Sequence, residues 1–577
     1  MSFKPINLCA IVLLSLVLIM TVTSIKDESL TIDELPHLPS GYSYLTQKDM
    51  RLNPEHPPLI KDLAALPLLL LKDLNFPLDD KTWTQDVNGQ WDFGNKFLFR
   101  SGNPSDQMIF LGRLPIILVL LLLGFFVFKW AKELWGEKTA LLALFLFSFS
   151  PTLLTHGRLV TTDVGAAFGV VLATYFFLKF LREPSFKNVF LAGLALGIGL
   201  LTKFSMFLLL PYFAFVLFVW LTINFQSWQQ LFKSIIVYGL KFLGLVALAA
   251  TVIWLIYLFH VWNYPPERQA RDSQFLLASN RAIFRENIPQ MAYNSVWRPF
   301  GQYLLGLTMV IQRGASGNTT YFLGEVSASG WKNYFPVVYA IKEPLAFFVL
   351  LILGLLAAAL ANKKSFSLKN YFSEFSFLVF IVLYWLTSLS GNLNIGVRHL
   401  LPVFPFTMML VSRATFLWLK EPFLKPKTVF LGLLLAWQAG QVWAVFPSFF
   451  AYFNELAGGP SRGYVYVVDS NLDWGQDLKR LSQWLEKNKI EKIYLDYFGG
   501  ADRYYYLGEK QLWWWGTMKP EQMSQSPYLA ISATFLQGGR GEPVAGFSGP
   551  TGYYRWLDQY EPIAKIGQSI FVYKTRP

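Results

Sequence analysis

Apolar runs close to the length of a bilayer crossing recur along this chain, and they constrain its fold more than any other feature. About 20 residues of helix are needed to cross roughly 30 Å of hydrocarbon. The 577 residues are 53% apolar and only 15% charged, whereas soluble domains average about 25% charged. The sequence therefore predicts an α-helical polytopic membrane protein with about eleven spans, at 6–25, 109–129, 138–155, 163–181, 188–201, 204–222, 235–260, 336–360, 375–390, 398–419 and 428–448.

The basic residues are distributed unevenly between alternate loops. They crowd one set of short loops, at Lys129, Lys132, Lys138, Lys179, Arg182, Lys187, Lys363, Lys364, Lys369, Arg413, Lys420, Lys425 and Lys427. The short loops between these contain little beyond Arg158, Lys203 and Arg398. By the positive-inside rule the basic side is cytoplasmic. The net charge of +13 thus reflects topology, and a nucleic-acid partner is not expected.

This topology divides the chain into two parts. With a cytoplasmic N-terminus, an odd number of spans places three large pieces outside: loop 26–108, loop 263–335 and tail 449–577. We expect a transmembrane module over 1–448 and an exterior domain over 449–577. The sequence leaves two of these span assignments undecided. Residues 188–201 are short for a span, and residues 6–25 follow Lys4 as the apolar core of a cleavable signal peptide would.

The exterior pieces carry their own secondary-structure signals. The apolar stretches 62–71 and 299–312 are predicted to lie along the membrane interface. In the tail, strands are predicted at 464–469, 491–498 and 528–535, and an amphipathic helix at 473–488 with Asp473 as its cap. The tail is therefore expected to form a small α/β domain. The single cysteine, Cys9, excludes an intramolecular disulfide and a cysteine-based metal site.

The first outer loop gathers ionisable residues beside a bilayer surface. TIDELPHLPSGYSYL supplies the adjacent acids Asp33 and Glu34 together with His37, and NPEHPPLIK supplies His56 and Lys61. Carboxylates in partly desolvated surroundings have shifted pKa values and act as bases. The alternative for the acid pair is a solvated loop, and for Lys61 it is a lysine whose charge reaches the interface while its stem stays buried.

Further charged residues fall on the same outer side. His156, Arg158 and Asp163 lie in HGRLVTTD, where Asp163 is read either as a functional acid entering a membrane helix or as part of a helix start. Lys203 and Arg398 are cations in outer loops that otherwise hold few. With Lys61 they suggest an anion site, since arginine donates two parallel hydrogen bonds to a phosphate.

One polar stretch of the tail imitates a calcium-binding loop. DSNLDWGQD at 469–477 spaces Asp469, Asn471, Asp473 and Asp477 suitably, but Trp474 stands where glycine is required. Arg480 also replaces the glutamate of the twelfth position. We therefore interpret the stretch as the end of a strand leading into a helix.

Several blocks in this order resemble one family of membrane enzymes. DELPHLPSGY, NPEHPPLIK, HGRLVTTD, GLLTKFS, YFLGE, GWKNYFPVVYAIKEPL, RHLLP and SNLDWGQDLKRL run from about 33 to 481. They resemble the polytopic glycosyltransferases of the type C fold, in particular the protein O-mannosyltransferase group (family 39). The likeness is strongest to the bacterial branch, which includes aminoarabinose transferases. The predicted α/β tail differs from the family pattern, because the eukaryotic mannosyltransferases carry β-trefoil domains instead.

The resemblance implies a reaction and assigns roles to residues. It implies transfer of a sugar from a polyprenyl-phosphate donor on the outer face of a bacterial inner membrane, to a glycan, lipid or protein acceptor. The family's catalytic base falls on Asp33 and its second acid on Asp163, with Glu34 in support. The residues that the resemblance assigns to binding of the donor phosphate are Lys61 and Arg398, with His56 and Lys203 as further candidates.

The residue types are consistent with one direct displacement. A lipid phosphate is a good leaving group, so cations stabilise its charge while a carboxylate takes the acceptor's proton. No cofactor is required, although a divalent ion held by Asp33, Glu34 and Asp163 stays an open alternative. The rival function is a lipid-sugar transporter, which would need charges along a path through the bilayer. Neither the sugar, the acceptor nor the oligomeric state follows from the sequence.

Overall fold

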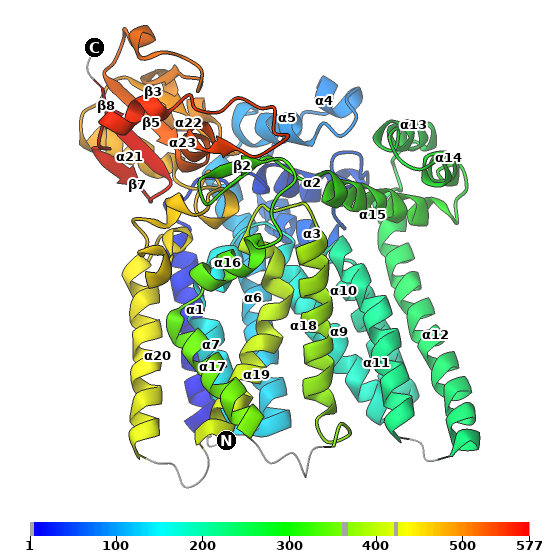
Figure 1. Cartoon of the computed structure of the whole chain (residues 1–577). Coiled ribbons are helices and arrows are strands. Elements are labelled where there is room, and N and C mark those ends of the chain that lie inside the picture. Colours follow the sequence, from blue (N-terminus) through cyan, green and yellow to red (C-terminus); the bar gives the residue numbers. More distant parts are fainter. Residues whose placement is uncertain (1–4, 225–226, 361–366, 420–424, 576–577) are drawn as a thin grey trace.

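The protein is a helical bundle covered at one end by a cap, which is made of the two long loops and the C-terminal tail (Figure 1). The computed structural model describes residues 5–224, 227–360, 367–419 and 425–575. The two ends of the chain lie at opposite ends of the bundle, the N-terminus at the uncovered end and the C-terminus in the cap (Figure 1). Opposite ends are what an odd number of crossings requires.

Within the described residues, eight helical segments are long and apolar enough to cross a membrane. They are α1 (Pro5–Ser24), α6 (Ser105–Trp135), α9 (Asp163–Arg182), Phe204–Asn224 with η3 (Phe204–Leu208) and α11 (Leu209–Asn224), α12 (Trp228–His260), α18 (Phe372–Ser390), Val397–Leu419 with η5 (Val397–Val403) and α19 (Phe404–Leu419), and α20 (Lys425–Val445). A ninth is the pair α16 (Tyr334–Lys342) and α17 (Leu345–Leu360), bent by 110°. The chain is an α-helical polytopic membrane protein, as the sequence predicts.

Two of the eleven predicted spans are shorter than expected. The segment predicted at 138–155 is two helices, α7 (Glu137–Ser148) and α8 (Pro151–His156), because Ser150 caps a new helix by accepting a hydrogen bond from the Leu153 amide. The segment at 188–201 is α10 (Phe186–Leu200), with 15 residues. Both α7 and α10 nevertheless pack within the bundle (Figure 1). Of the predicted basic-loop residues, Lys363, Lys364 and Lys420 lie outside the described part of the chain.

The two large outer loops form helices that lie across the end of the bundle. The first loop contains α2 (Glu34–Gln47), α3 (Leu59–Ala65), α4 (Lys81–Thr84) and α5 (Gln90–Asn95), and the second contains α13 (Pro266–Leu276), α14 (Ala282–Met291) and α15 (Arg298–Ser316). The stretches expected at the interface fall on α3 with the turn η1 (Leu66–Leu70) and on α15. Both α3 and α15 lie at the boundary between bundle and cap (Figure 1).

The tail folds into a small α/β domain, as predicted. Its sheet has the order β4-β3-β5-β8-β7, in which β3 runs parallel to β4 and β5 while β8 runs antiparallel to β5 and β7. The elements are α21 (Leu478–Lys487), β3 (Ile493–Asp496), α22 (Arg503–Leu507), β4 (Gln511–Trp513), β5 (Tyr528–Ser532), α23 (Ala533–Arg540), β7 (Ala564–Ile566) and β8 (Ile570–Lys574).

Two details of the predicted tail are wrong. Residues 464–469 form a 3-10 turn and one isolated bridge between Phe322 and Val467 in place of a strand. The amphipathic helix begins at Leu478, since the residues before it are buried against the bundle. The residue before the helix is Asp477, so Asp473 is not its cap.

A second, three-stranded sheet ties the tail to the second outer loop. In it β2 (Glu325–Ser327) pairs with β1 (Thr320–Phe322) on one side and with β6 (Glu542–Pro543) of the tail on the other. Backbone hydrogen bonds between β2 and β6 thus join the tail to the second long loop.

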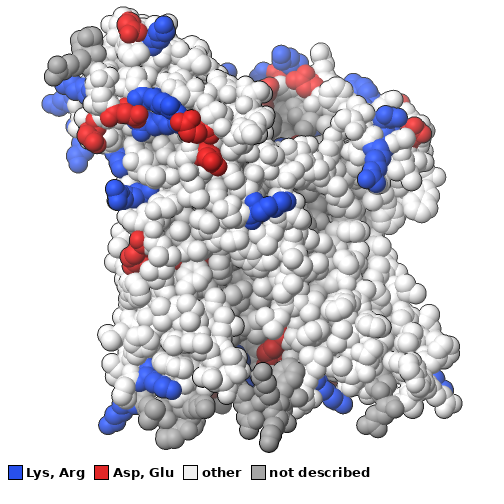
Figure 2. Space-filling view, viewed as in Figure 1, with Lys and Arg blue, Asp and Glu red and all other residues white. Residues whose placement is uncertain are grey.

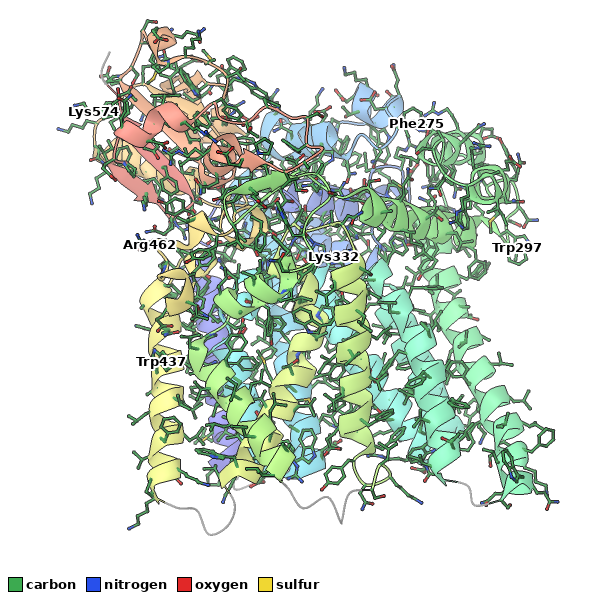
Figure 3. All side chains as sticks on the ribbon, in the orientation of Figure 1. Phe275, Trp297, Lys332, Trp437, Arg462 and Lys574 are labelled. Carbon is green, nitrogen blue, oxygen red and sulfur yellow. The ribbon has the colours of Figure 1, made fainter. Side chains whose placement is uncertain are left out.

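Charged side chains mark the two ends of the bundle. Figure 2 shows Lys, Arg, Asp and Glu gathered on the cap and at the opposite end, with an almost uncharged belt between them. In Figure 3, Lys332 and Arg462 lie where the bundle meets the cap, and Trp437 lies on α20 below them. The apolar belt is the surface that a bilayer would cover.

Candidate active site

The first loop brings Asp33 to the outer end of the bundle. Asp33 is the residue immediately before α2, and the chain ahead of it is fixed by a hydrogen bond from the Ile32 amide to the Trp474 carbonyl (3.1 Å). The Asp33 side chain is 24% exposed. Its Oδ2 accepts from Arg398, whereas Oδ1 has no hydrogen-bond partner among the described residues. Asp33 therefore has an accessible oxygen that is able to take a proton.

Asp163 meets Asp33 from a different helix. It is the first residue of α9, and its side chain is 1% exposed. Lys203 lies at the start of η3 and donates from Nζ to Oδ1 of Asp163 at 2.5 Å. The helix N-terminus adds a partial positive charge that favours the carboxylate. Asp163 is thus a buried acid held by a cation from a neighbouring turn.

Arg398 connects the two acids. It lies in η5 at the outer end of α19, and its Nη1 donates to Oδ2 of Asp33 (2.8 Å) and to Oδ2 of Asp163 (3.2 Å). Its Nε donates to Oγ of Ser470 at 3.1 Å, and its guanidinium carbon lies 4.1 Å from the centre of the Trp474 ring. No described residue accepts from Nη2, so this edge of the guanidinium is available to a ligand.

We call Asp33, Asp163, Lys203 and Arg398 the site cluster. Each comes from a different part of the chain, and all four were predicted as site residues. The structure brings them into one chain of ion pairs, Asp33–Arg398–Asp163–Lys203. Their catalytic and binding roles stay predictions, but their proximity is established by the geometry.

Histidines surround the site cluster. The Nδ1–H of His37 donates to the Val160 carbonyl (3.0 Å), and the His37 ring meets the edge of the His56 ring at 5.3 Å between centres. Burial is the main cause that lowers the pKa of both His37 and His56, although the Asp33 carboxylate opposes it at His37. Both rings are therefore neutral at neutral pH.

Three buried histidine nitrogens near the site cluster have no hydrogen-bond partner among the described residues. They are Nδ1 of His56, Nδ1 of His156 and Nε2 of His399, and the charge of Asp163 acts on all three rings. A buried polar atom without a partner costs about 1–3 kcal/mol. The three rings are thus the buried polar groups near the site cluster whose hydrogen bonding is incomplete.

Glu34, predicted as a supporting catalytic residue, does not join the site cluster. Its side chain is wholly buried and bridged twice by Arg113, at 2.8 and 2.6 Å. The amides of Thr31 and Val160 donate to the same carboxylate, each at 2.9 Å. Arg113 and these hydrogen bonds hold the pKa of Glu34 low despite its burial, which is the largest influence and acts in the opposite sense. Glu34 fixes the first loop to α6 and to the residues before α9.

Lys61, predicted as a phosphate contact, is also directed into the protein. Its Nζ donates to the carbonyls of Asn53 (2.9 Å) and His56 (2.8 Å) and to the Tyr44 hydroxyl (3.1 Å). Burial lowers the pKa of Lys61 to about 7. All three of its donor positions are occupied, so Lys61 stabilises the NPEH turn and has none left for a donor phosphate.

Sequence reasoning missed two residues that touch Arg398, namely Ser470 and Trp474. Both belong to the stretch that imitates a calcium loop. The only signal in the sequence was a tryptophan within a polar loop. Asp469 of the same stretch is near enough for Arg398 to oppose the burial that raises its pKa to about 7.

The structure does not bring together Asp33, Glu34 and Asp163, the three acids that the sequence left open as metal ligands. Among the described residues, no group of three or more His, Cys, Asp or Glu side chains is placed to hold a metal ion. The guanidinium of Arg398 forms ion pairs with both Asp33 and Asp163. Glu34, the third proposed ligand, is paired with Arg113.

Comparison with known proteins supports the resemblance carried by the sequence blocks. The model of the dolichyl-phosphate-mannose-protein mannosyltransferase family matches residues 105–254. A search of curated proteins found no match. The matched region runs from α6 into α12 and includes Asp163 and Lys203 of the site cluster.

The solved structures that match this chain share low sequence identity with it. ArnT from Cupriavidus metallidurans, solved with undecaprenyl phosphate, is 12% identical over 98% of this chain and 99% of its own, with a TM-score of 0.45. The Archaeoglobus fulgidus oligosaccharyltransferase in its apo form is 12% identical over 94% of this chain and 72% of its own, with a TM-score of 0.47.

The yeast protein is matched over a smaller part of its length. The S. cerevisiae Pmt1–Pmt2 O-mannosyltransferase complex, solved with the sugar donor, is 19% identical over 46% of this chain and 34% of its own, with a TM-score of 0.35. This chain thus spans about a third of the yeast chain that it matches. By its sequence blocks and by the family match over residues 105–254, the chain resembles the polytopic glycosyltransferases of the type C fold.

Proposed function

We propose that this protein is an inverting glycosyltransferase that uses a polyprenyl-phosphate-linked sugar. It moves the sugar to a hydroxyl or phosphate group of an envelope glycan, lipid or protein. Asp33 is the base, and Arg398 with Lys203 binds the donor phosphate. The observation that carries the proposal is the site cluster, in which an accessible carboxylate lies 2.8 Å from an arginine with an unused donor edge.

The chemistry is a single displacement in which the atoms balance. The acceptor oxygen attacks the anomeric carbon and its proton passes to Asp33. The bond between that carbon and the phosphate oxygen breaks, and the polyprenyl phosphate leaves with both bonding electrons. Arg398 and Lys203 stabilise the charge that develops on the phosphate. One displacement inverts the anomeric centre, and no covalent enzyme intermediate is needed.

Asp163 supports the cations in this scheme. Its carboxylate binds Lys203 at 2.5 Å and Arg398 at 3.2 Å. A buried acid between two cations reduces their mutual repulsion and fixes the distance between them. We therefore assign Asp163 to the orientation of the phosphate-binding pair, and we keep the base for Asp33, whose side chain is the more exposed of the two.

The side of the membrane is part of the proposal. The site cluster lies at the capped end of the bundle, and the predicted cytoplasmic loops lie at the other end. We infer a cytoplasmic N-terminus and an exterior cap, in the inner membrane of a bacterium. The support is the loop charge asymmetry together with the size of the cap (Figure 1).

A transporter of lipid-linked sugars would bind the same headgroup without reaction. It would need polar groups along a path between the two ends of the bundle. The site cluster is instead confined to one end, where the outer ends of α9 and α19 meet the cap. The face of the bundle seen below it in Figure 2 is almost uncharged. Reaction at the surface is therefore favoured over passage.

Mass spectrometry of the cell envelope tests the proposal. Lipid, glycan and secreted-protein fractions are compared between cells that express the wild type and Asp33→Asn at equal levels. A sugar-sized mass present only with the wild type supports transfer and identifies the acceptor class. If the fractions are identical while a deletion strain differs from both, transport replaces transfer.

The reaction is expected to proceed without a divalent metal, since Arg398 already binds both acids of the site cluster. Purified enzyme is assayed in excess EDTA and then with Mg²⁺ or Mn²⁺ restored. Turnover is expected to change by less than about twofold in either case. Loss of activity in EDTA that a divalent ion restores would contradict this assignment.

A further inference from the structure

The stretch 469–477 is the part of the exterior domain that reaches the site cluster. Ser470, Asn471 and Trp474 are all at most 2% exposed, although the stretch is polar and reads as a loop. Oδ1 of Asn471 accepts a hydrogen bond from the amide of Val397 (2.9 Å), the residue before Arg398. The exterior domain is therefore docked directly onto the turn that carries the arginine.

This stretch holds Arg398 from two directions. Oγ of Ser470 accepts from Nε of Arg398 and itself donates to the carbonyl of Ile395. The Trp474 ring lies 4.1 Å from the guanidinium carbon, at a distance where a cation is attracted to an aromatic face. The Ser470 hydroxyl thus holds the Nε edge of the guanidinium, and the Trp474 ring limits the tilt of its plane.

The close approach of the two segments depends on a glycine. Gly396 has a φ of +154°, and a Cβ built on it would lie 2.1 Å from Oγ of Ser470. Any other residue at this position would separate the tail from η5. The backbone at Gly396 and the side chain of Ser470 are thus matched to each other.

The same stretch also fixes the chain ahead of Asp33. The Ile32 amide donates to the Trp474 carbonyl, and the Ser29 amide donates to the Gln476 carbonyl at 2.9 Å. Oγ of Ser29 donates to the Gly475 carbonyl at 2.8 Å. One segment of the tail therefore holds the backbone that carries the acid and the side chain of the arginine.

We propose that Ser470 and Trp474 are positioning residues of the donor-phosphate site, so that the exterior domain is part of the catalytic centre. This inference rests on the proposed function of Arg398. The hydrogen bond to Nε and the ring under the guanidinium turn Nη2 toward the space where the phosphate binds. Without them the arginine pairs with Asp33 and Asp163 in several orientations, and the donor binds more weakly.

Binding of undecaprenyl phosphate to the purified full chain in detergent tests the proposal. Ser470→Ala and Trp474→Leu are each expected to weaken binding about tenfold or more, since a hydrogen bond to a charged group is lost in one and a buried cation–ring contact in the other. Trp474→Phe keeps an aromatic face and is expected to recover most of the affinity. Trp514→Phe is the matched control, because Trp514 is 1% exposed in the same domain and does not contact the site cluster.

A double-variant comparison separates positioning from general stability. In an Arg398→Gln background, Ser470→Ala is expected to cause no further loss of affinity, since its effect passes through the arginine. Equal losses in both backgrounds would show that Ser470 acts on the fold alone, and would overturn the proposal. If Trp474→Leu does not fold, Ser470→Ala decides, because it removes a single oxygen.

The remaining outcomes are distinguishable. If Arg398→Gln loses affinity while Ser470→Ala and Trp474→Leu bind as the wild type does, the positioning role is overturned and the proposed function stands. If the wild type itself does not bind undecaprenyl phosphate, the proposed donor site and the inference built on it both fail.

Discussion

Asp33 and Glu34 are neighbours in the sequence, yet the structure gives them opposite environments. Asp33 is 24% exposed, shares one oxygen with Arg398 and keeps the other accessible. Glu34 is fully buried, and Arg113 with two backbone amides occupies both of its oxygens. The two carboxylates thus pair with different arginines on different helices.

The contrast shows how to separate a reacting charge from a structural one. Both acids are ion-paired, so pairing alone does not distinguish them. Spare hydrogen-bonding capacity does, because a group whose donors and acceptors are all satisfied inside the protein cannot also bind substrate. The same criterion separates Arg398, which has an unused Nη2, from Lys61, whose three donor positions are filled.

Removal of the arginine on the Asp33 side is expected to give the largest effect on catalysis. Arg398→Gln should lower kcat/KM for the donor by about 100-fold to 1000-fold, the range seen when one charge-stabilising donor is lost. Arg398→Lys should recover little of this, because an ammonium cannot reproduce the guanidinium's separate bonds to Ser470, Asp33 and Asp163. Steady-state kinetics with varied donor measure the change. A normal kcat/KM in Arg398→Gln would rule out the phosphate assignment.

Removal of the acid on the structural side should affect stability in place of chemistry. Glu34→Gln leaves the buried Arg113 charge without its carboxylate and should lower the free energy of unfolding by about 3–5 kcal/mol. Thermal or denaturant unfolding in detergent measures this loss. The fraction that remains folded should turn over within about threefold of the wild-type rate. Normal stability with abolished turnover would instead place Glu34 in the reaction.

Substitution of Lys61 tests the same distinction for the cations, between Arg398 with its unused Nη2 and Lys61 with all donor positions filled. Lys61→Met leaves the carbonyl of His56 without its Lys61 donor and the carbonyl of Asn53 with only the Tyr44 hydroxyl, and it should lower stability by about 1–3 kcal/mol. The KM for the donor should change by less than about threefold. A tenfold rise in KM at unchanged stability would restore the phosphate role that the sequence suggested for Lys61.

Protonation of the buried histidines is expected to have a smaller effect, on the pH dependence of the free energy of unfolding. Burial lowers the pKa of His37 and His56 below the ordinary value near 6.5. Below that pH the unfolded chain binds protons that the folded protein does not, so the free energy of unfolding falls as the pH decreases. Unfolding measured from pH 7 to 5 should show this slope. The slope should be shallower in a variant with both His37→Gln and His56→Gln, and an unchanged slope would contradict the assignment.

The sequence predicted the fold class and much of the site for physical reasons. Apolar length reports directly on the bilayer, so the helical bundle could be predicted from the recurrence of apolar runs. Asp163, Lys203 and Arg398 stood out because charges are costly near a membrane helix and few lie on the outer side. Their proximity to Asp33 was expected from the family resemblance, and the structure shows the ion pairs that join them.

The rest depended on contacts that sequence patterns do not contain. Glu34 and Lys61 have the same residue types and context as reactive groups, and only the structure places them against other partners, Arg113 for Glu34 and the NPEH carbonyls for Lys61. Ser470 and Trp474 reach Arg398 from more than 70 residues away in the chain. The break at Ser150 likewise depends on a single capping hydrogen bond within an apolar run.

The most direct test of this account is the turnover of Asp33→Asn at matched donor binding. Purified wild type and variant are titrated with undecaprenyl phosphate, and transfer to the acceptor identified by envelope mass spectrometry is then timed. We predict that the affinities agree within about threefold while kcat falls by about 100-fold to 10,000-fold, the contribution of a general base. Near-normal turnover by a folded Asp33→Asn enzyme would contradict the central claim.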